Sequence, residues 1–392
     1  MNRSGRGEQP TTLVVTYSTD SSISMSLEKG NFDEVKRQVE SYTTLGKVAL
    51  ITQDSSDFSY LFSNVSHVPC GVRTHQPIRR TLYILGAWLW LARRRKEIRL
   101  VRGYGIGCLH AALFCRICKV PLVVSYEYDW SDQMLATGRA VAGILAKQIE
   151  SLVFTSACVT VGLSRRLCEK AKKRGAKKVT CIGNYVDTGS APILSAEEIS
   201  DLRRKVGSCD RKLVMYAGRL HRVKRVRDLI HSLALLRSKG VNPILLIAGE
   251  GDEKKNLVRL VEEKDLSEEV RFLGAIPHQQ VFRCLQITDA FVLPSAMEGN
   301  PRVLLEAMFC KVPIVAYNVT GVNDLLDNGR TGLLAEPFKV EELSEAIGQV
   351  LSKPEVARQL ANEAYEEFLR TEQQNPLERN VELVRKVLEG QM

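Results

Sequence analysis

The chain has 392 residues, of which 44% are hydrophobic and 26% are charged, and its formal net charge is +10 at pH 7. This length exceeds one ordinary hydrophobic core and is typical of two domains of about 200 residues each. Residues 1–10 lack the apolar core of a secretory signal, and no aromatic-basic interleaving, zinc-ligand spacing or helix-turn-helix pattern supports nucleic-acid binding, despite the basic charge.

Four short apolar runs in the N-terminal half are predicted strands, at residues 12–17, 47–52, 98–103 and 121–126. A serine-rich loop, residues 18–26, follows the first of them. The fourth run ends in Glu127-Tyr128-Asp129. In an open α/β sheet such a strand end faces the ligand cleft, so Glu127 and Asp129 are candidate catalytic acids. The alternative is that the two acids cap a turn.

The excess positive charge lies in the first half of the chain, with 30 Lys+Arg against 18 Asp+Glu in residues 1–205. Its densest part, residues 73–102, encloses the uncharged segment 81–92, which contains Trp88 and Trp90. Twelve residues are too few to span a bilayer, which needs about 20. Two tryptophans between arginines are typical of a membrane interface. The alternative is a buried helix before the strand at residue 98. Both interpretations hold if one face of this helix is buried and its basic ends are free.

The ten cysteines show no spacing of a secreted disulfide framework. Cys115 and Cys118 form a single Cys-x-x-Cys pair, whereas a structural zinc site needs four ligands. We therefore expect ordinary buried thiols and a cytoplasmic protein, and the basic segment adds a peripheral position on the inner face of the membrane as an alternative.

A polar stretch from Ser195 to Arg211 is the predicted domain boundary. The predicted ranges are an N-terminal domain at 1–205, a C-terminal domain at 206–353, and terminal helices at 354–392. Strands alternate with helices of about 10 to 15 residues in the C-terminal half, which favours a parallel doubly wound sheet.

The first motif of the C-terminal half is a strand at 213–217 that runs into Gly218-Arg219-Leu220. The basic segment His221-Arg222-Val223-Lys224-Arg225 and an amphipathic helix follow. The cationic side chains of this motif favour an anionic ligand, because fixed positive charges in a dry cleft stabilise developing negative charge.

The second motif is a buried strand at 289–294 followed by a glycine-proline turn and a helix. It places Glu298 in the turn and Glu306 on the helix, about 12 Å further along the axis. Pro301 is expected at the first helical position, where its missing N–H costs nothing. The free amides of this helix start favour an anion.

Taken together, these motifs resemble the signatures of retaining GT-B glycosyltransferases, in the large glycosyltransferase family 4. The spacing of Glu298 and Glu306 is similar to the Glu-x7-Glu signature, and residues 218–225 are similar to the Gly-Arg-Leu…Glu-Lys-Gly element. The strand at 270–274, the segment Thr320-Gly321-Val322-Asn323-Asp324 and the closing Thr331-Gly332-Leu333 follow in the family's order. The resemblance covers residues 210–350 and implies an α/β fold of the GT-B type, two Rossmann-like domains facing a central cleft. It also implies that the terminal helices cross back to the first domain.

The resemblance also implies a role for each candidate residue. Arg219 and Lys224 would hold the donor diphosphate, Glu298 would contact the donor sugar, and Glu306 would hold the ribose hydroxyls. The remaining donor-binding positions act mainly through the backbone: Gly218 in the first turn; Gly274, Ala275 and Ile276 beside the nucleotide base; and Gly299, Asn300, Pro301, Arg302 and Val303 at the diphosphate.

The sequence departs from the family pattern at several places. Val223 replaces the usual Glu, and Arg225 the usual Gly, so that Arg225 either adds charge or crowds the turn. The first Gly and the Glu of the family's Gly-Gly-x-x-Glu are altered at Thr320 and Asp324. In the N-terminal half, Glu127 and Asp129 stand where many members have a His.

The predicted function is transfer of a sugar, with retention, from a UDP- or GDP-sugar to a glycan, lipid-linked or small-molecule acceptor. No metal or other cofactor is expected. Two alternatives stay open: a non-catalytic partner subunit of the same fold, which the altered N-terminal residues favour, and a nucleotide-sugar epimerase, which the Glu-x7-Glu pattern disfavours.

Overall fold

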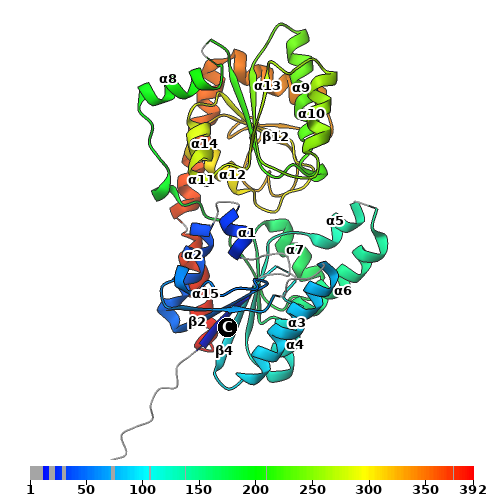
Figure 1. Ribbon diagram of the computed structural model, residues 1–392, viewed down its shortest axis with the longest axis vertical. Coiled ribbons are helices and arrows are strands. Elements are labelled where there is room, and N and C mark those ends of the chain that lie inside the picture. Colours follow the sequence, from blue (N-terminus) through cyan, green and yellow to red (C-terminus); the bar gives the residue numbers. More distant parts are fainter. Residues whose placement is uncertain are drawn as a thin grey trace, which may run out of the picture. The chain divides into compact units, whose positions relative to one another are not determined.

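The computed structural model describes residues 12–16, 23–28, 32–71, 76–105, 107–136, 138–208, 210–373 and 375–392. They form two compact units (Figure 1). The N-terminal unit comprises Met1–Gly183 with Pro376–Met392, and the C-terminal unit comprises Asn184–Asn375.

The described part of the N-terminal unit contains a parallel sheet of seven strands. Val14 of its first strand packs into one core, whereas Leu13 and Val15 pack into the core on the opposite face. Burial on both faces explains why the predicted strands are continuous apolar runs. The strands lie in the order β3 (Val65–Pro69), β2 (Lys47–Thr52), β1 (Thr12–Thr16), β4 (Ile98–Tyr104), β5 (Leu122–Tyr126), β6 (Val159–Gly162) and β7 (Val179–Cys181).

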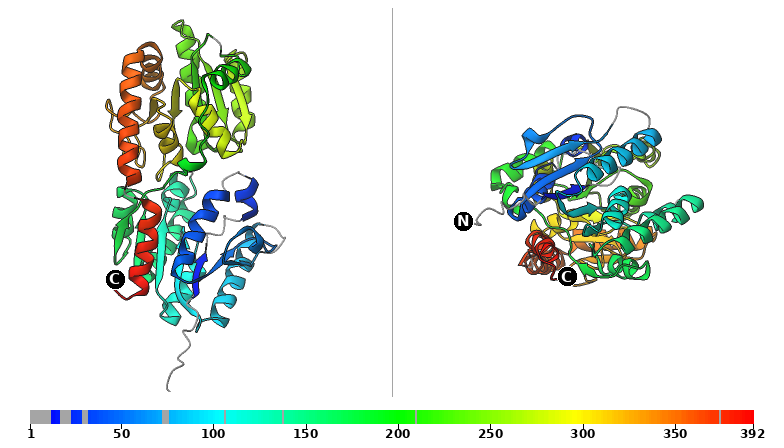
Figure 2. Two further views of the ribbon diagram at one scale, coloured as in Figure 1. Left: turned by 90° about the vertical axis from the view of Figure 1, so that its left-hand side faces the viewer. Right: turned by 90° about the horizontal axis from the view of Figure 1, so that it is seen from below.

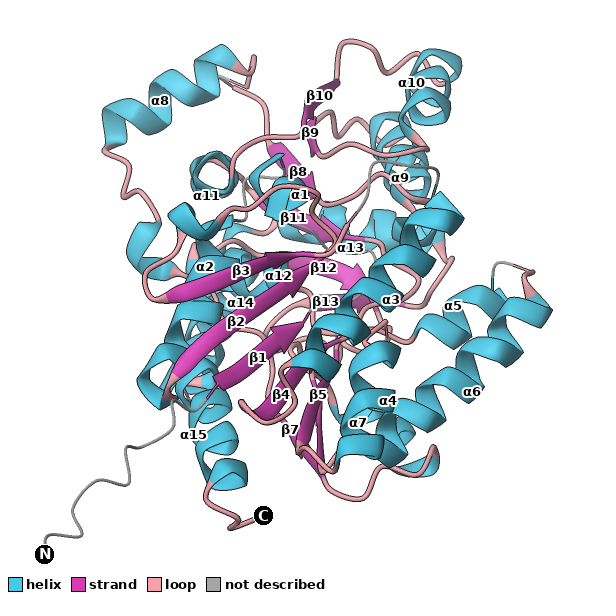
Figure 3. Ribbon diagram, turned by 60° about the horizontal axis from the view of Figure 1, so that its bottom comes forward, coloured by secondary structure: helices cyan, strands magenta, loops and turns pink. Residues whose placement is uncertain are grey.

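Helices cover both faces of this sheet (Figure 3). One face carries α3 (Gln76–Arg93), α4 (Leu109–Cys118), α6 (Ala140–Ser156) and α7 (Arg165–Lys173). The other carries α1 (Ile23–Glu28), α2 (Phe32–Glu40), the 3₁₀ turn η1 (Ser41–Leu45) and α15 (Pro376–Leu388). Figure 2 shows α15, in red, along the side of this unit. A short helix, α5 (Trp130–Ala136), packs against α6.

The C-terminal unit contains a second parallel sheet, of six strands in its described part. Their order is β10 (Val270–Gly274), β9 (Ile244–Ala248), β8 (Leu213–Ala217), β11 (Ala290–Leu293), β12 (Ile314–Tyr317) and β13 (Leu333–Ala335). The chain therefore builds outward from β8 in one direction and then from β11 in the other. The surrounding helices are α8 (Ala196–Lys205), α9 (Val226–Ser238), α10 (Lys254–Glu263), α11 (His278–Gln286), α12 (Arg302–Phe309), α13 (Val340–Ser352) and α14 (Pro354–Gln373).

The prediction of two doubly wound α/β domains is confirmed. Three edge strands were not predicted. One of them, β3, alternates buried Val65 with exposed Ser66 and so lacks the continuous apolar run of a central strand. The other two, β7 and β13, are only three residues long.

The division into units differs from the predicted ranges. The stretch from residue 195 to 211 is largely helix α8, capped by Ser195 and Glu198, and not a linker. Its polar composition is that of a surface helix, of which only Ile199 and Leu202 pack against the core of the C-terminal unit. Within residues 354–392, α14 belongs to the C-terminal unit and α15 to the N-terminal unit.

Candidate active site

The two predicted donor motifs follow neighbouring strands of the C-terminal sheet. Residues 218–225 follow β8, and residues 294–301 follow β11, its direct neighbour. These strands are also the point at which the strand order reverses. Ligands of open α/β sheets bind outside the carboxyl ends of the strands at such a switch point, so the topology brings both motifs to the expected ligand position.

The first loop is held close to the end of β9. The amide of Gly218 donates to the carbonyl of Ala248 (2.9 Å). A Cβ on Gly249 would lie 1.9 Å from the carbonyl oxygen of Gly218, so only glycine permits this approach. The hydroxyl of Tyr216 donates to the carbonyl of Arg219 (3.0 Å) and leaves the Arg219 side chain exposed. Arg219 is therefore presented to solvent from a fixed backbone.

The turn accommodates Arg225 in the position of the family's usual glycine, and its charge is paired. Its backbone is left-handed (φ 52°), the conformation for which the family's usual glycine is suited. Its guanidinium forms two hydrogen bonds to Asp228 (2.9 and 2.8 Å) and lies over the ring of Phe338 (4.9 Å). The charge of Arg225 is thus paired inside the start of α9, whereas Lys224 points elsewhere.

Lys224 joins the first loop to the second. Its Nζ donates to Oε1 of Glu298 at 2.7 Å, and the Glu298 side chain is 7% exposed. The amide of Ala296 also donates to the carbonyl of Val223 (2.8 Å). One ion pair and one backbone hydrogen bond therefore fix the two motifs to each other.

The turn after Glu298 is fastened from two further sides. Asn184 donates its backbone amide to Oδ1 of Asn300 (2.9 Å) and its side-chain amide to the carbonyl of Asn300 (2.6 Å). Gly321 packs so closely that a Cβ there would lie 2.6 Å from the carbonyl oxygens of both Glu298 and Gly299. Gly321, the glycine that is kept in the altered family segment, thus packs directly against the turn.

The helix after this turn begins one residue later than predicted. Pro301 is the N-cap of α12, with φ −72° and ψ 112°, and Arg302 is the first helical residue. The extended ψ of Pro301 lets its carbonyl accept the amide of Leu304 (3.1 Å). A helix start leaves its first amides without intrahelical partners, so the start of α12 is a position that favours an anion.

Glu306 is buried on α12 and pairs with a residue that the sequence analysis missed. Nε2 of His278, at the start of α11, lies 2.9 Å from Oε1 of Glu306. This hydrogen bond raises the pKa of His278 above its ordinary value, against the lowering effect of burial. In the part of the chain that the structure describes, Oε2 of Glu306 accepts no hydrogen bond, so one oxygen of the carboxylate is available to a ligand.

This pair predicts a pH-dependent contribution to stability. The pKa of His278 is raised in the folded protein. The pair therefore contributes fully to the free energy of unfolding below the unfolded-state pKa, near 6.5, and this contribution is lost as the pH rises through the folded-state pKa. His278→Asn should therefore lower the free energy of unfolding by about 1 kcal/mol at acidic pH and by less at alkaline pH. Denaturant unfolding of both proteins across this range measures the difference.

The control for that experiment is His231, whose pKa is lowered by burial and by Lys264 and Arg227. Its substitution by Asn should give the opposite trend with pH, because a lowered pKa costs stability as the pH falls. A cost of His278→Asn that is the same at all pH values would contradict the ion pair.

The loop predicted beside the nucleotide base lies at the end of β10. Gly274 adopts φ +71°, and its carbonyl accepts the amide of Gly249 (2.7 Å). Ala275 is exposed and Ile276 is half-buried just beyond it. The loop is therefore tied to the β9 loop that also contacts Gly218, which brings the predicted base and diphosphate segments to one edge of the sheet.

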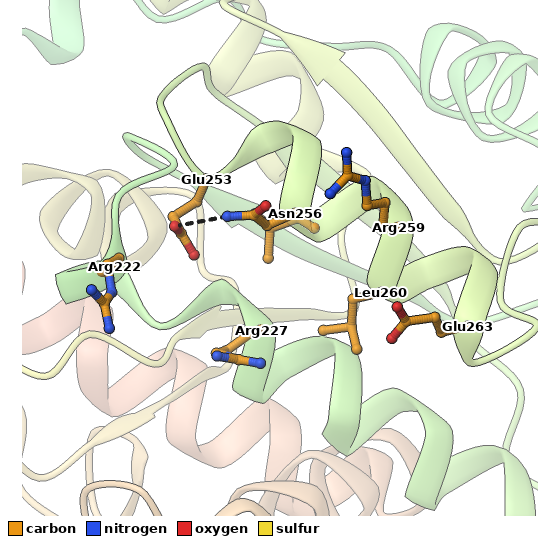
Figure 4. A pocket seen from close by; sticks show the side chains of 8 residues that line it. Arg222, Arg227, Glu253, Asn256, Arg259, Leu260 and Glu263 are labelled. Carbon is orange, nitrogen blue, oxygen red and sulfur yellow. Dashed lines mark hydrogen bonds between the residues drawn. The ribbon is translucent and has the colours of Figure 1, made fainter.

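A polar groove of about 450 Å³ lies beside the first loop, between α9 and α10 (Figure 4). It is lined by Arg222, Arg227, Glu253, Asn256, Leu257, Arg259, Leu260 and Glu263. Neither Lys224 nor the paired acids Glu298 and Glu306 line it. The side chain of Arg222 thus belongs to this outer groove, although the residue is only two positions from Lys224.

The two acidic candidates of the N-terminal unit differ from each other. Glu127 is exposed after the end of β5. Asp129 is buried and accepts from the amide of Asp132 (3.0 Å) at the start of α5, while Lys170 donates to both carboxylates. Burial raises the pKa of Asp129, but the hydrogen bonds from Lys170 and from the amide of Asp132, together with the charges of Lys170 and Arg174, outweigh this effect and hold the pKa below its usual range. Asp129 therefore caps a helix, whereas a catalytic role for either acid stays a prediction.

The Cys-x-x-Cys pair lies on α4. Cys115 is buried on α4, where burial raises the pKa of its thiol well above the ordinary value, and Cys118 is half-buried. Among the residues that the structure describes, no group of three or more His, Cys, Asp or Glu side chains is arranged to hold a metal ion.

Comparison with known proteins identifies relatives of the chain. Residues 198–367 match the family described as glycosyl transferases group 1. The alpha-D-kanosaminyltransferase of Streptomyces kanamyceticus is 28% identical over 300 residues, which are 72% of this chain and 78% of that protein. Several further curated relatives are matched over only about half of their own length.

Solved structures match almost the whole chain. Sucrose-phosphate synthase from Thermosynechococcus elongatus has a TM-score of 0.80 at 19% identity, covering 98% of this chain and 100% of that chain. Anabaena Alr3699/HepE in complex with UDP-glucose has a TM-score of 0.75 at 18% identity, covering 97% of this chain and 100% of that chain.

These findings confirm the predicted resemblance to GT-B glycosyltransferases and the predicted fold class. The matched family and the kanosaminyltransferase are glycosyltransferases by name, which is the activity of enzymes of the EC 2.4 class. Within the described residues, no helix combines the length and the apolar character needed to cross a membrane.

Proposed function

We propose that this chain, whose sequence and fold resemble those of GT-B glycosyltransferases, transfers a sugar from a UDP- or GDP-sugar to a glycan, lipid-linked or small-molecule acceptor, with retention at the anomeric carbon. The observation that carries this proposal is the pairing of Lys224 with Glu298 where the loops after β8 and β11 meet. It places a cation and a carboxylate together at the ligand position of the sheet.

The cations act on the leaving group. A nucleoside diphosphate gains negative charge as the bond to the sugar breaks, and preorganised positive charge stabilises that change. Lys224 is held in place by Glu298, while Arg219 is exposed on a fixed backbone. The start of α12 would also favour the phosphate oxygens. The residues at the site thus fit a diphosphate leaving group without a metal ion.

The acids orient the two ends of the donor. Glu298 would orient the donor sugar, because it is the carboxylate that pairs with Lys224, the cation proposed for the diphosphate. Glu306 would accept from the ribose hydroxyls through Oε2, since His278 already holds Oε1. The loop at Gly274, Ala275 and Ile276 would bind the base through main-chain groups.

The paired acids give a prediction that separates their roles. Glu306→Gln should weaken binding of the bare nucleoside diphosphate about tenfold, because one charge-assisted hydrogen bond to ribose is weakened. Glu298→Gln should leave that binding nearly unchanged and lower turnover with the nucleotide sugar. Isothermal titration calorimetry with UDP and GDP measures the first effect. Equal losses of binding in both variants would show that the roles are wrongly assigned.

The donor itself is found by incubating the protein with a panel of UDP- and GDP-sugars and measuring release of the nucleoside diphosphate. One donor should be hydrolysed slowly in water and faster with its acceptor. Proton NMR of the first-formed product then gives the anomeric configuration, which should equal that of the donor. Inversion would contradict the proposed stereochemistry, and epimerised donor would favour the epimerase alternative.

A lipid-linked acceptor agrees with the basic segment 73–102 of the N-terminal unit. We propose that this segment contacts an anionic membrane surface on the cytoplasmic side, where Lys and Arg side chains are attracted to acidic headgroups.

A further inference from the structure

Exposed apolar side chains are concentrated on three helices of the N-terminal unit. Of the fourteen large hydrophobic residues that are exposed in the described part of the chain, nine lie on α3, α4 and α6. Scattered exposed hydrophobic residues are normal, but a contiguous group marks an interaction site. The nine are Ile78, Leu82, Leu85 and Leu89 on α3; Leu113 and Ile117 on α4; and Val141, Ile144 and Leu145 on α6.

The spacing of these residues shows that each helix has two apolar sides. On α3, Tyr83, Ala87 and Leu91 are fully buried in the core, whereas the exposed residues recur every three or four positions on another side. Such spacing places them on one stripe of the helix. The tryptophans do not form this stripe, since Trp88 and Trp90 pack partly against the core. The helix is therefore both a core helix and the carrier of an uncovered apolar stripe.

The three stripes belong to one layer. Helices α3, α4 and α6 cover the same face of the sheet, and α4 packs against both α3 and α6 (Figures 1 and 3). Their sides away from the sheet therefore share one general direction. We call this outer side the α3–α4–α6 face. In α6 the exposed residues lie in the first two turns, where Val141 is 74% exposed.

The charges around the α3–α4–α6 face are almost all positive. No acidic residue is exposed on its three helices in the described part of the chain, and Glu150 of α6 is buried against Arg174. The segment that follows α3 carries one exposed acid, Glu97. None of the exposed basic residues that follow forms a described ion pair. They are Arg93 at the end of α3; Arg94, Arg95, Lys96 and Arg99 after it; Arg116 and Lys119 at α4; and Arg139 and Lys147 at α6.

We infer that the α3–α4–α6 face is the membrane-docking surface of this protein and that its partner is an anionic lipid bilayer. Apolar side chains with a basic surround are the composition of elements that lie in a bilayer interface. The apolar stripes would enter the headgroup region, while the guanidinium and ammonium groups bind lipid phosphates. The inference deepens the membrane contact proposed for residues 73–102, because it adds α4 and α6 and assigns the insertion to aliphatic residues.

The test is co-sedimentation of the full chain with vesicles of phosphatidylglycerol and phosphatidylcholine, and with vesicles of phosphatidylcholine alone. Binding should require the anionic lipid and should fall steeply as salt is raised, because exposed charges are screened. The double variant Ile117→Ser/Ile144→Ser should reduce the fraction bound at least about tenfold, since aliphatic burial is lost. Ile193→Ser, at a 95% exposed position of the C-terminal unit, is the control and should bind normally.

A second pair of variants tests the charges. Replacing Arg93, Arg94 and Arg95 by Ser should weaken binding by about 100-fold, or roughly fivefold for each charge. The matched control carries the same loss of charge on the C-terminal unit, at Lys239, Lys255 and Lys339. Circular dichroism and thermal unfolding check that each variant is folded. A variant that is unfolded is replaced by Leu85→Ser/Leu89→Ser, a double change on the exposed stripe of α3.

Three results would overturn the inference. They are equal binding to neutral and anionic vesicles, no difference between the variants and their controls, and a stable dimer that the Ile117→Ser/Ile144→Ser change dissociates. The last result would assign the face to a second copy of the chain. Vesicle binding is measured without nucleotide sugar, whereas donor hydrolysis is measured without vesicles, so failure of the docking surface is distinguishable from failure of the proposed sugar transfer.

Discussion

Lys224→Ala is expected to lower turnover at least about 100-fold, and Arg219→Ala to have a similar effect. Removal of one preorganised donor from a site that stabilises developing charge has effects of this size. Lys224→Ala should lower turnover more than Arg219→Ala, because it also removes the ion-pair partner of Glu298, which lies 2.7 Å from Lys224. Steady-state kinetics with the donor found in the panel measures both variants.

The control for these variants lies on the same turn. Arg222→Ala removes an exposed cation two residues from Lys224, but its side chain lines the groove between α9 and α10. Its turnover should stay within about twofold of the unchanged protein, since a surface charge away from the reacting atoms contributes little. If Arg222→Ala were as damaging as Lys224→Ala, the diphosphate would not be assigned to Lys224. Full activity of Lys224→Ala would exclude its role altogether.

Gly321→Ala is expected to give the second large effect, although residue 321 is not placed in contact with the donor. A Cβ would lie 2.6 Å from the carbonyl oxygens of Glu298 and Gly299, and the backbone has φ +86°. The turn must shift to make room, and a misplacement of about 1 Å costs roughly 100-fold in rate. The free energy of unfolding should fall by about 2 to 4 kcal/mol, from the left-handed backbone and the contact together.

The left-handed backbone alone is tested at Gly329. This glycine has φ +79° and no atom within 4 Å of an added Cβ. Gly329→Ala should therefore lower the free energy of unfolding by only about 1 to 2 kcal/mol and leave turnover unchanged. If both alanine variants kept normal kinetics, the turn at Glu298 would not be the element that positions the donor.

The donor motifs could be predicted from the sequence because their information is local. A strand, a glycine turn and a helix start are encoded by consecutive residues, and the two motifs follow neighbouring strands, as the doubly wound order requires. The position of Pro301 was wrong by one residue, since the sequence does not show whether a proline ends the turn or begins the helix.

The partners of these motifs could not be predicted, because they come from distant parts of the chain. His278 is 28 residues from Glu306, and Asn184 is 116 residues from Asn300. A single histidine after the predicted base loop gives no signal of a carboxylate partner. The same limit applies to Asp129, which follows a strand as a catalytic acid would, but is bonded to Lys170 and the start of α5.

The basic segment of the N-terminal half shows a different limit. Its composition indicated a membrane interface and its position in the fold indicated a buried helix, and α3 has both a buried and an exposed apolar side. Tryptophans were the expected membrane anchors, yet they pack partly against the core, whereas leucines occupy the exposed stripe. A uniformly apolar helix does not show in sequence which side meets the sheet.

The central claim is that a nucleoside diphosphate binds where the loops after β8 and β11 meet, and amide hydrogen exchange tests it most directly. The protein is exchanged with and without a saturating amount of the nucleoside diphosphate that calorimetry identifies. We predict slower exchange at residues 218–225 and 296–304 and no change at residues 253–263, which line the outer groove. Protection confined to residues 253–263, or no protection of either donor loop at saturation, would contradict the proposed site.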